Sequence, residues 1–210
     1  MLEQLALLGL GWLAGLLSPA LIEGIKVRRE TTAVVAAIKS ELNEVGYRLA
    51  LGAYSVAEHL GSIDRGVLTW TRDAISSYRG TESTANIAAF IDEWLALEDD
   101  QFQVLVEHSK AKGKAALTLP RVSLPYTDAR VPGWHHLPLS VRLELVNIHS
   151  DVRLINDAVD LSRSYLGLTF TSLSDENMDA VVANIRGAYK QYGDRCRIAA
   201  NKMTRLYRVI

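Results

Sequence analysis

The stretch that decides the fold is the N-terminal one, MLEQLALLGLGWLAGLLSPALIEGIKVRRE, residues 1–30. Between Leu5 and Ile22 it contains no charged residue. A helix of roughly 20 apolar residues is long enough to cross the hydrocarbon core of a bilayer. We therefore predict that residues 1–28 form a transmembrane anchor and that residues 29–210 form a separate helical domain.

Three other interpretations of the apolar stretch stay open beside the anchor. A cleaved signal peptide has a positive N-terminal region and a small-residue cleavage site, whereas here Glu3 comes first and the basic residues follow the apolar run. A buried helix is usually shorter and alternates with polar residues. A helix lying on a membrane surface needs a charged face, which Leu5–Ile22 lacks. The anchor is the favoured interpretation.

The residues beside the predicted span give it a direction. Lys26, Arg28 and Arg29 follow it directly, and positive flanks tend to stay in the cytoplasm. The sequence therefore predicts a single-pass membrane protein whose N-terminus lies outside and whose bulk is cytoplasmic, an arrangement that suits a bacterial inner membrane. Pro19 is expected to bend the helix, because it removes one backbone hydrogen bond.

Small residues recur at a spacing of four within the span, as Gly11 with Gly15 and Ala14 with Ser18. This spacing lets two membrane helices approach closely and pack by van der Waals contact. Gly11, Ala14, Gly15 and Ser18 are therefore a candidate face for helix association.

Composition restricts the function of the remaining chain. With 49% hydrophobic and 22% charged residues, the 210-residue chain is globular rather than disordered. A net charge of −1 gives no electrostatic case for a nucleic-acid partner. The single cysteine, Cys196, excludes an intramolecular disulfide, which agrees with a reducing compartment.

Apolar residues in alternating steps of three and four predict helices over most of the domain. Because no Pro or Gly lies between Lys26 and Val45, the membrane helix is expected to continue directly into the first of them. Shorter helices are expected over 63–78 and over 84–105, the second with a bend at 98–100. Two long helices are expected over 139–166 and from a Ser174 cap to Leu206. The predicted fold is all-α, an antiparallel bundle of four to five helices on the membrane helix.

Residues 113–137 form one long Pro-rich loop, which we expect to lie pinned along the bundle or across one end. Leu117–Tyr126 within it is the only strand candidate. The loop also gathers the densest set of reactive side chains: Tyr126, Asp128, Arg130, Trp134, His135 and His136. Two His and an Asp could bind a metal or act as acid and base. Alternatively, Trp134 anchors the loop while Asp128 and Arg130 make local bonds.

No other cluster has the spacing of a catalytic or metal site. Glu144 and His149 are five residues apart and so lie on different helix faces. The acidic residues that follow are expected to form a solvated face, with at most one polar contact between helices. Cys196 lies on a helix seam and is expected to be a buried small hydrophobe. The basic residues near the C-terminus are expected to be solvated or to contact anionic lipid. No cofactor or metal is predicted.

These observations predict a non-enzymatic, membrane-anchored helical bundle that acts through protein–protein contacts, as a scaffold, regulator or sensor. Its partners would be the lipid bilayer and either an unidentified protein or a second copy of the chain. One alternative is a membrane-perturbing effector that self-associates through its span. The other is an enzyme that uses the loop Tyr126–His136.

Overall fold

The computed structural model describes residues 2–80, 83–112, 116–172 and 174–210, with the backbone alone described at 2–18, 20–21 and 110–112. Every regular element in these ranges is a helix, so the prediction of an all-α fold is confirmed. Since no described residue lies in a strand, the strand considered for Leu117–Tyr126 is wrong. The elements are α1 (Leu2–Leu60), α2 (Arg65–Ser77), α3 (Ala85–Leu95), α4 (Asp99–Lys112), α5 (Pro125–Ala129), the 3-10 helix η1 (Val131–His136), α6 (Leu139–Leu168) and α7 (Asp175–Val209).

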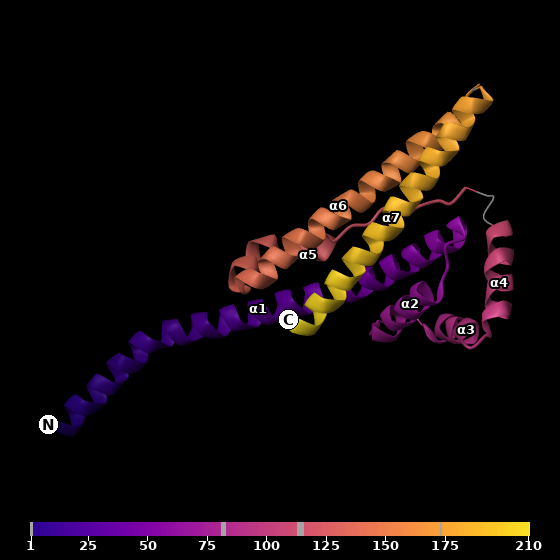
Figure 1. Ribbon diagram of the computed structural model, residues 1–210. Coiled ribbons are helices and arrows are strands. Elements are labelled where there is room, and N and C mark those ends of the chain that lie inside the picture. The colour runs from indigo at the N-terminus through magenta and orange to yellow at the C-terminus, as the bar shows by residue number, and fades with distance from the viewer. Residues whose placement is uncertain (1, 81–82, 113–115, 173) are drawn as a thin grey trace.

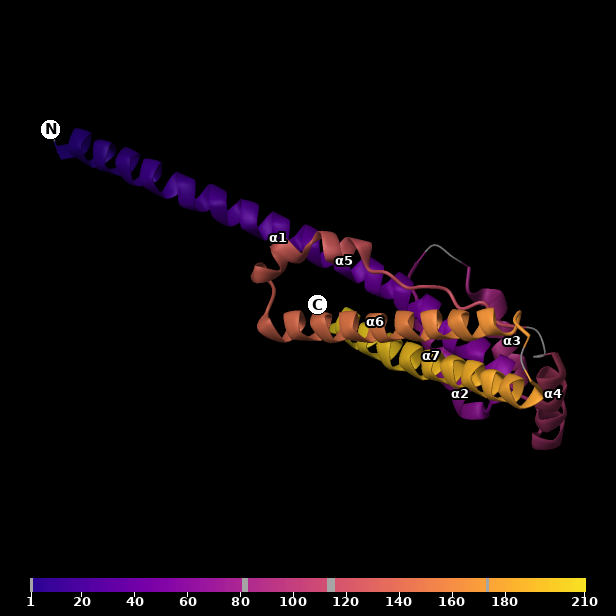
Figure 2. The same ribbon diagram turned by 90° about the horizontal axis from the view of Figure 1, so that it is seen from above.

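Helix α1 dominates the shape of the molecule. Its 59 residues run without interruption from Leu2 to Leu60, and its N-terminal part projects far beyond the other helices (Figures 1 and 2). The predicted continuity across Lys26–Val45 is thus confirmed. The projecting part, which contains Pro19, changes direction in Figure 1. Val34 is the first described residue of α1 to be buried, so the bundle begins there.

The predicted transmembrane anchor receives no support from the structure. Among the residues whose side chains are described, no helix is both long enough and apolar enough to cross a membrane. Most of the predicted span, Leu5–Ile22, and the association face Gly11, Ala14, Gly15 and Ser18 have side chains outside the described set. Both stay predictions.

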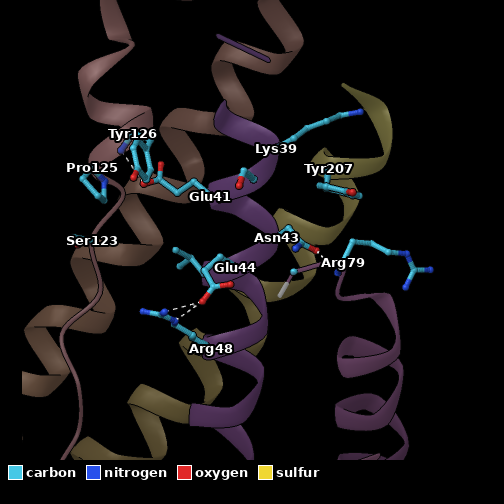
Figure 3. A pocket seen from close by; sticks show the side chains of 13 residues that line it. Lys39, Glu41, Asn43, Glu44, Arg48, Arg79, Ser123, Pro125, Tyr126 and Tyr207 are labelled. Atoms are coloured by element: carbon cyan, nitrogen blue, oxygen red, sulfur yellow. Dashed lines mark hydrogen bonds and ion pairs between the residues drawn. The ribbon is translucent and has the colours of Figure 1, made fainter. Parts of the chain in front are cut away.

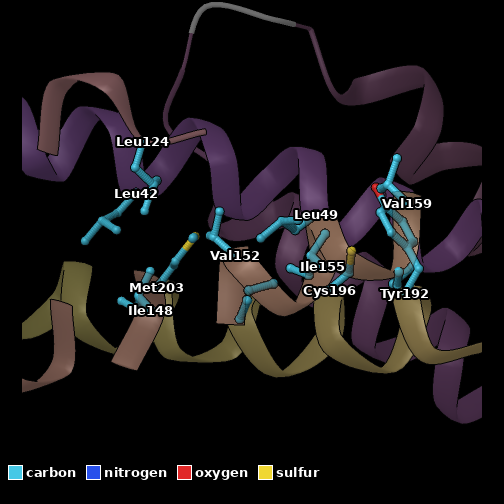
Figure 4. Close-up of a cluster of buried hydrophobic side chains, with 14 of the residues drawn as sticks. Leu42, Leu49, Leu124, Ile148, Val152, Ile155, Val159, Tyr192, Cys196 and Met203 are labelled. Atoms are coloured by element: carbon cyan, nitrogen blue, oxygen red, sulfur yellow. The ribbon is translucent and has the colours of Figure 1, made fainter. Parts of the chain in front are cut away.

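The main core is built by three long helices rather than the four to five predicted. Helix α7 packs against both α1 and α6, antiparallel to each, and α6 and α1 run in the same direction on either side of it (Figure 1). The predicted seam of α6 is buried from Val141 to Ser162, and that of α7 from Ile185 to Leu206. Figure 4 shows these seams meeting, with Leu42 and Leu49 of α1 facing Met203 and Ile155.

A second, smaller core lies on the opposite side of α1. There α2, α3 and α4 pack on one another and on Tyr47, whose ring stacks on that of Tyr78 at 4.3 Å between centroids. The predicted helix over 84–105 is divided at residues 96–98, near the expected bend. Arg65 of α2 stabilises the break between α3 and α4. Its guanidinium donates to the carbonyl oxygens of Leu95 and Leu97 at 2.8 and 2.6 Å and pairs with Asp99.

The helix ends follow the chemistry of their terminal residues. Gly61 ends α1 with a φ of 65°, a left-handed conformation that strains side chains with a Cβ. The Asp64 carboxylate accepts from the backbone N–H of Val67 at 2.7 Å and caps α2. Ser174 caps α7 as predicted, although the bond from the N–H of Asn177 is long at 3.4 Å.

Candidate functional site

Residues 116–124, here called the strap, lie extended along the bundle beside α1, α6 and α7, where a fourth helix would otherwise lie (Figure 2). The Tyr189 hydroxyl of α7 accepts from the N–H of Leu117 and donates to its carbonyl, at 3.0 and 2.9 Å. The Asn156 side chain of α6 bonds the N–H and carbonyl of Val122 in the same way, at 2.9 and 2.8 Å. Leu119 and Leu124 are buried. The strap is therefore pinned along the bundle, which is one of the two positions predicted for the Pro-rich loop.

A buried carboxylate on α1 fixes the end of the strap. Glu41 is only 5% exposed, and its two oxygens accept from the backbone N–H groups of Tyr126 and Thr127 at 2.8 and 2.6 Å. The Thr127 hydroxyl donates to the same carboxylate. These donors belong to the first turn of α5, where backbone N–H groups have no partner within the helix. Glu41 thus caps α5 from a helix distant in sequence. The contact gives the buried carboxylate its hydrogen-bond donors and gives the backbone N–H groups of the first turn their acceptor.

The predicted loop residue Asp128 meets a histidine that lies on α6. The Nε2 atom of His149 is 2.7 Å from the Asp128 carboxylate, and its Nδ1 atom is 2.8 Å from the carbonyl oxygen of Leu145. Trp134 covers this ring edge-on, with 5.6 Å between centroids, and packs against the main core. Asp128 and Trp134 therefore join η1 and α5 to α6.

This arrangement determines what the histidine can do chemically. A catalytic histidine uses one ring nitrogen for an orienting carboxylate and the other for the group that exchanges the proton. In His149 both nitrogens already face protein oxygens. The Asp128–His149 pair therefore has the geometry of a structural contact between the loop and α6, with no nitrogen presented to a substrate.

The remaining predicted loop residues do not converge on one point. Tyr126 is 66% exposed, and Arg130 is exposed as well. The Nδ1 atom of His135 lies 2.6 Å from the carbonyl oxygen of Pro132, and the rings of His135 and His136 are 3.7 Å apart between centroids. Among the described residues, no three His, Cys, Asp or Glu side chains come together as a metal site requires.

Of two further titratable side chains, Cys196 lies in the core and His59 is only partly buried. Cys196 is fully buried, as predicted, and burial raises the pKa of its thiol to about 12 although Tyr192 donates a hydrogen bond to it. Burial also lowers the pKa of His59, and the positive charge of Arg186 lowers it further. The His59 ring packs edge-on against Tyr189 at 5.2 Å. The Cys196 thiol is therefore not presented to solvent.

A cavity of about 560 Å³ opens beside the Glu41 cap, between α1, the strap and the C-terminal ends of α2 and α7. Figure 3 shows Lys39 and Tyr207 at one side of it and Tyr126 with Pro125 at the other. The lining charges are largely used within the protein. Glu44 pairs with Arg48 at 2.7 Å, and Lys39 lies 5.5 Å from the centre of the Tyr207 ring.

Four basic residues in the C-terminal part of α7 contact acidic or aromatic side chains, while Arg197, Arg205 and Arg208 are exposed, as expected of a solvated set. Lys202 pairs at 2.6 Å with Asp151, which is only 5% exposed, and Arg195 approaches the same carboxylate at 3.9 Å. Arg205 pairs with Glu144, and Arg197 lies over the ring of Trp70. The pairing of Asp151 with Lys202 is the polar contact between helices that the expectation for the acidic run allowed.

Sequence reasoning missed Glu41 and His149 as partners of the loop. Glu41 is not among the candidate residues of the sequence analysis, and His149 is compared there only with Glu144 of its own helix. Each bonds a residue far away in the chain, and Glu41 lies 86 residues from Thr127. One available signal was that a buried Pro-rich loop must satisfy its backbone N–H groups with side chains from neighbouring helices.

Comparison of the chain with models of protein families, with curated proteins and with solved structures gives no match. The function is therefore argued from the geometry.

Proposed function

We propose that this chain is a non-enzymatic helical bundle that is held at a membrane by the N-terminal part of α1 and acts through protein–protein contacts. The observation that carries the proposal is the continuity of α1, which joins the bundle to a long projecting segment (Figure 1). Among the residues before Val34 whose side chains are described, Pro19 and 22–33, none is buried. The uncharged stretch Leu5–Ile22 lies in this projecting segment.

An apolar helix that projects from its own domain needs another apolar environment. In water, an isolated helix is only marginally stable, because most helical stability in proteins comes from packing of its apolar face. A bilayer supplies that environment, and its thickness matches the length of the uncharged stretch. Lys26, Arg28 and Arg29 would then lie on the cytoplasmic side with the bundle, in the inner membrane of a bacterium.

The polar side chains around the loop already have partners within the protein, which favours a role in protein contacts over a catalytic one. Glu41 and His149 form hydrogen bonds with residues of α5, and Cys196 is buried as a protonated thiol. What the bundle offers to other molecules is its surface. As a scaffold, regulator or sensor, it would present that surface at a fixed height above the membrane, because α1 has no break between the projecting segment and the bundle.

Membrane fractionation tests the anchor. The full chain should sediment with membranes and resist a wash with alkaline carbonate. Leu13→Arg, in the middle of the predicted span, should release it, because an arginine at the centre of a membrane helix costs about 3 kcal/mol. Ala33→Arg, at an exposed position past the predicted anchor, is the control and should remain bound. Complete release of the unaltered chain by carbonate would contradict the proposal.

A further inference from the structure

Two cavities meet where the C-terminal ends of α2 and α7 lie beside α1. The cavity of about 560 Å³ beside the Glu41 cap shares Asn43, Arg79 and Tyr207 with a smaller cavity of about 210 Å³. Figure 3 shows these three shared residues and Lys39 together on one side of the larger cavity. Sites for small molecules are concave and have volumes of about 300–1,000 Å³, so the larger cavity has room for such a ligand.

Three positive side chains at this junction have no carboxylate partner. Lys39 and Arg79 line the larger cavity and Arg208 lines the smaller one. Within the part of the chain that the structure describes, none of the three forms an ion pair. Lys39 lies 5.5 Å from the centre of the Tyr207 ring, a contact that leaves its ammonium N–H groups free to donate elsewhere. The Nη1 atom of Arg79 donates to two backbone carbonyl oxygens at the end of α2, and its other guanidinium nitrogens have no acceptor among the described residues.

The carboxylates that line the larger cavity already have donors within the protein. Both oxygens of Glu41 accept from α5. One oxygen of Glu44 accepts from Arg48 at 2.8 Å, and the other accepts from the hydroxyl of Tyr78 at 2.6 Å. The side-chain oxygen of Asn43 accepts from a backbone N–H just past α2 at 3.1 Å, which leaves the amide nitrogen of Asn43 to donate. The junction therefore offers positive charge and N–H donors to a ligand that carries acceptors.

We propose that this junction binds a small phosphorylated molecule, whose phosphate lies between Lys39, Arg79 and Arg208. A phosphate monoester carries a charge of about −1.5 to −2 at neutral pH and three acceptor oxygens, which match several separate donors better than one carboxylate does. Guanidinium groups bind phosphate through paired hydrogen bonds. The rest of the ligand lies toward Tyr126, at the opposite side of the cavity, where a ring that is 66% exposed is available for packing (Figure 3). This inference goes beyond the proposed role at a membrane.

The position of the junction favours a dissolved ligand over the phosphate of a lipid headgroup. On a continuous helix Lys39 lies about 25 Å beyond Ile22, the end of the uncharged stretch. The headgroup layer on one side of a bilayer is only about 5–8 Å thick. With α1 anchored as proposed, lipid phosphates therefore lie well short of the cavity. This choice of source rests on the proposed anchor, whereas the phosphate site itself does not.

Titration of the full chain in a phosphate-free detergent with phenyl phosphate, followed by phosphorus NMR, tests the site. We expect a Kd of about 1 mM for the unaltered chain. Lys39→Gln and Arg208→Gln should each weaken binding about tenfold, because each removes one charged hydrogen bond to the phosphate. Arg153→Gln removes an exposed arginine of α6 outside both cavities and is the matched control, which should bind as the unaltered chain does. No binding of phenyl phosphate, or equal affinity in all three variants, would overturn the proposal.

A change at Tyr126 separates the contact with the organic part of the ligand from the contact with the phosphate. Tyr126→Ala should weaken phenyl phosphate about fivefold, because it removes a partner for the phenyl ring. The same change should leave the affinity for inorganic phosphate unaltered, since it removes no donor at the Lys39 side. An equal loss for both probes would place the phosphate beside Tyr126 and refute the arrangement.

Nanodiscs distinguish a dissolved ligand from a lipid. The full chain should bind phenyl phosphate equally in phosphatidylcholine nanodiscs with and without phosphatidic acid, whose headgroup is a phosphate monoester. Loss of phenyl phosphate binding in the presence of phosphatidic acid would assign the junction to the lipid and overturn the choice of a dissolved ligand. A chain that resists carbonate but does not bind phenyl phosphate refutes the site and leaves the anchor standing. A chain that is released by carbonate but binds the probe refutes the anchor and leaves the site.

Discussion

Removal of the Glu41 carboxylate should release the start of α5 from the bundle. Glu41→Ala deletes the acceptor for the N–H groups of Tyr126 and Thr127 and for the Thr127 hydroxyl. A hydrogen bond to a charged group contributes about 1.5–3 kcal/mol, and a buried donor left without an acceptor costs about 1–3 kcal/mol. Because Tyr126 is exposed, water can reach part of the vacated site. We expect a net loss of about 3 kcal/mol in the free energy of unfolding.

Two further variants make this loss interpretable. Glu41→Gln keeps one amide oxygen as an acceptor and should lose about half as much stability. Glu30→Ala removes an exposed carboxylate from the same helix and should change stability by less than about 0.5 kcal/mol. Urea unfolding followed by circular dichroism measures all three variants.

Hydrogen exchange locates the effect. In the unaltered chain the amides of Tyr126 and Thr127 should exchange slowly, and Glu41→Ala should accelerate them far more than amides in the middle of α7. An Ala variant no less stable than the Glu30→Ala control, or amides of α5 that exchange equally in both, would refute the assignment of Glu41 as the cap.

Three other perturbations have outcomes that follow from the structure. The Cys196 thiol should resist a thiol reagent until urea unfolds the chain. Because its pKa rises from 9.0 to about 12 on folding, the contribution of the protonated thiol to stability is complete below about pH 9 and is lost as the pH rises toward 12. Cys196→Ala should therefore reduce the fall of the urea midpoint between about pH 9 and 10. Gly61→Ala should cost about 1 kcal/mol in urea unfolding because of its left-handed φ, whereas Gly187→Ala, with nothing within 4 Å of the new Cβ, should gain up to about 1 kcal/mol. His149→Ala should lose about 1 kcal/mol through its bond to Asp128, and Asp128→Asn should lose less; equal stability of His149→Ala and the unaltered chain would show that the contact is not formed in solution.

The helices were predictable because their signals are local. The seams of α6 and α7 repeat in steps of three and four, and the buried residues Leu145, Ile155, Cys196 and Met203 all lie on them. The continuity of α1 followed from the absence of Pro and Gly over Lys26–Val45. Caps such as Asp64 depend on the next three residues only.

The number of core helices and the site contacts were not predictable in this way. The strap occupies the place of a fourth helix because its backbone bonds to Tyr189 and Asn156, which are distant in sequence. Periodicity shows that Tyr189 lies on a seam, but it does not show what that seam meets. For the same reason the pattern of α7 alone did not show that Lys202 pairs with the buried Asp151 of α6.

We propose that α1 is one helix that passes from a membrane into the bundle. Hydrogen exchange of the full chain in lipid nanodiscs, followed by mass spectrometry, tests it most directly. We expect slow exchange over residues 5–22, faster exchange over residues 23–33, most of which are exposed, and slow exchange again from Val34 onward. Exchange over residues 5–22 as fast as that over 23–33 would contradict it.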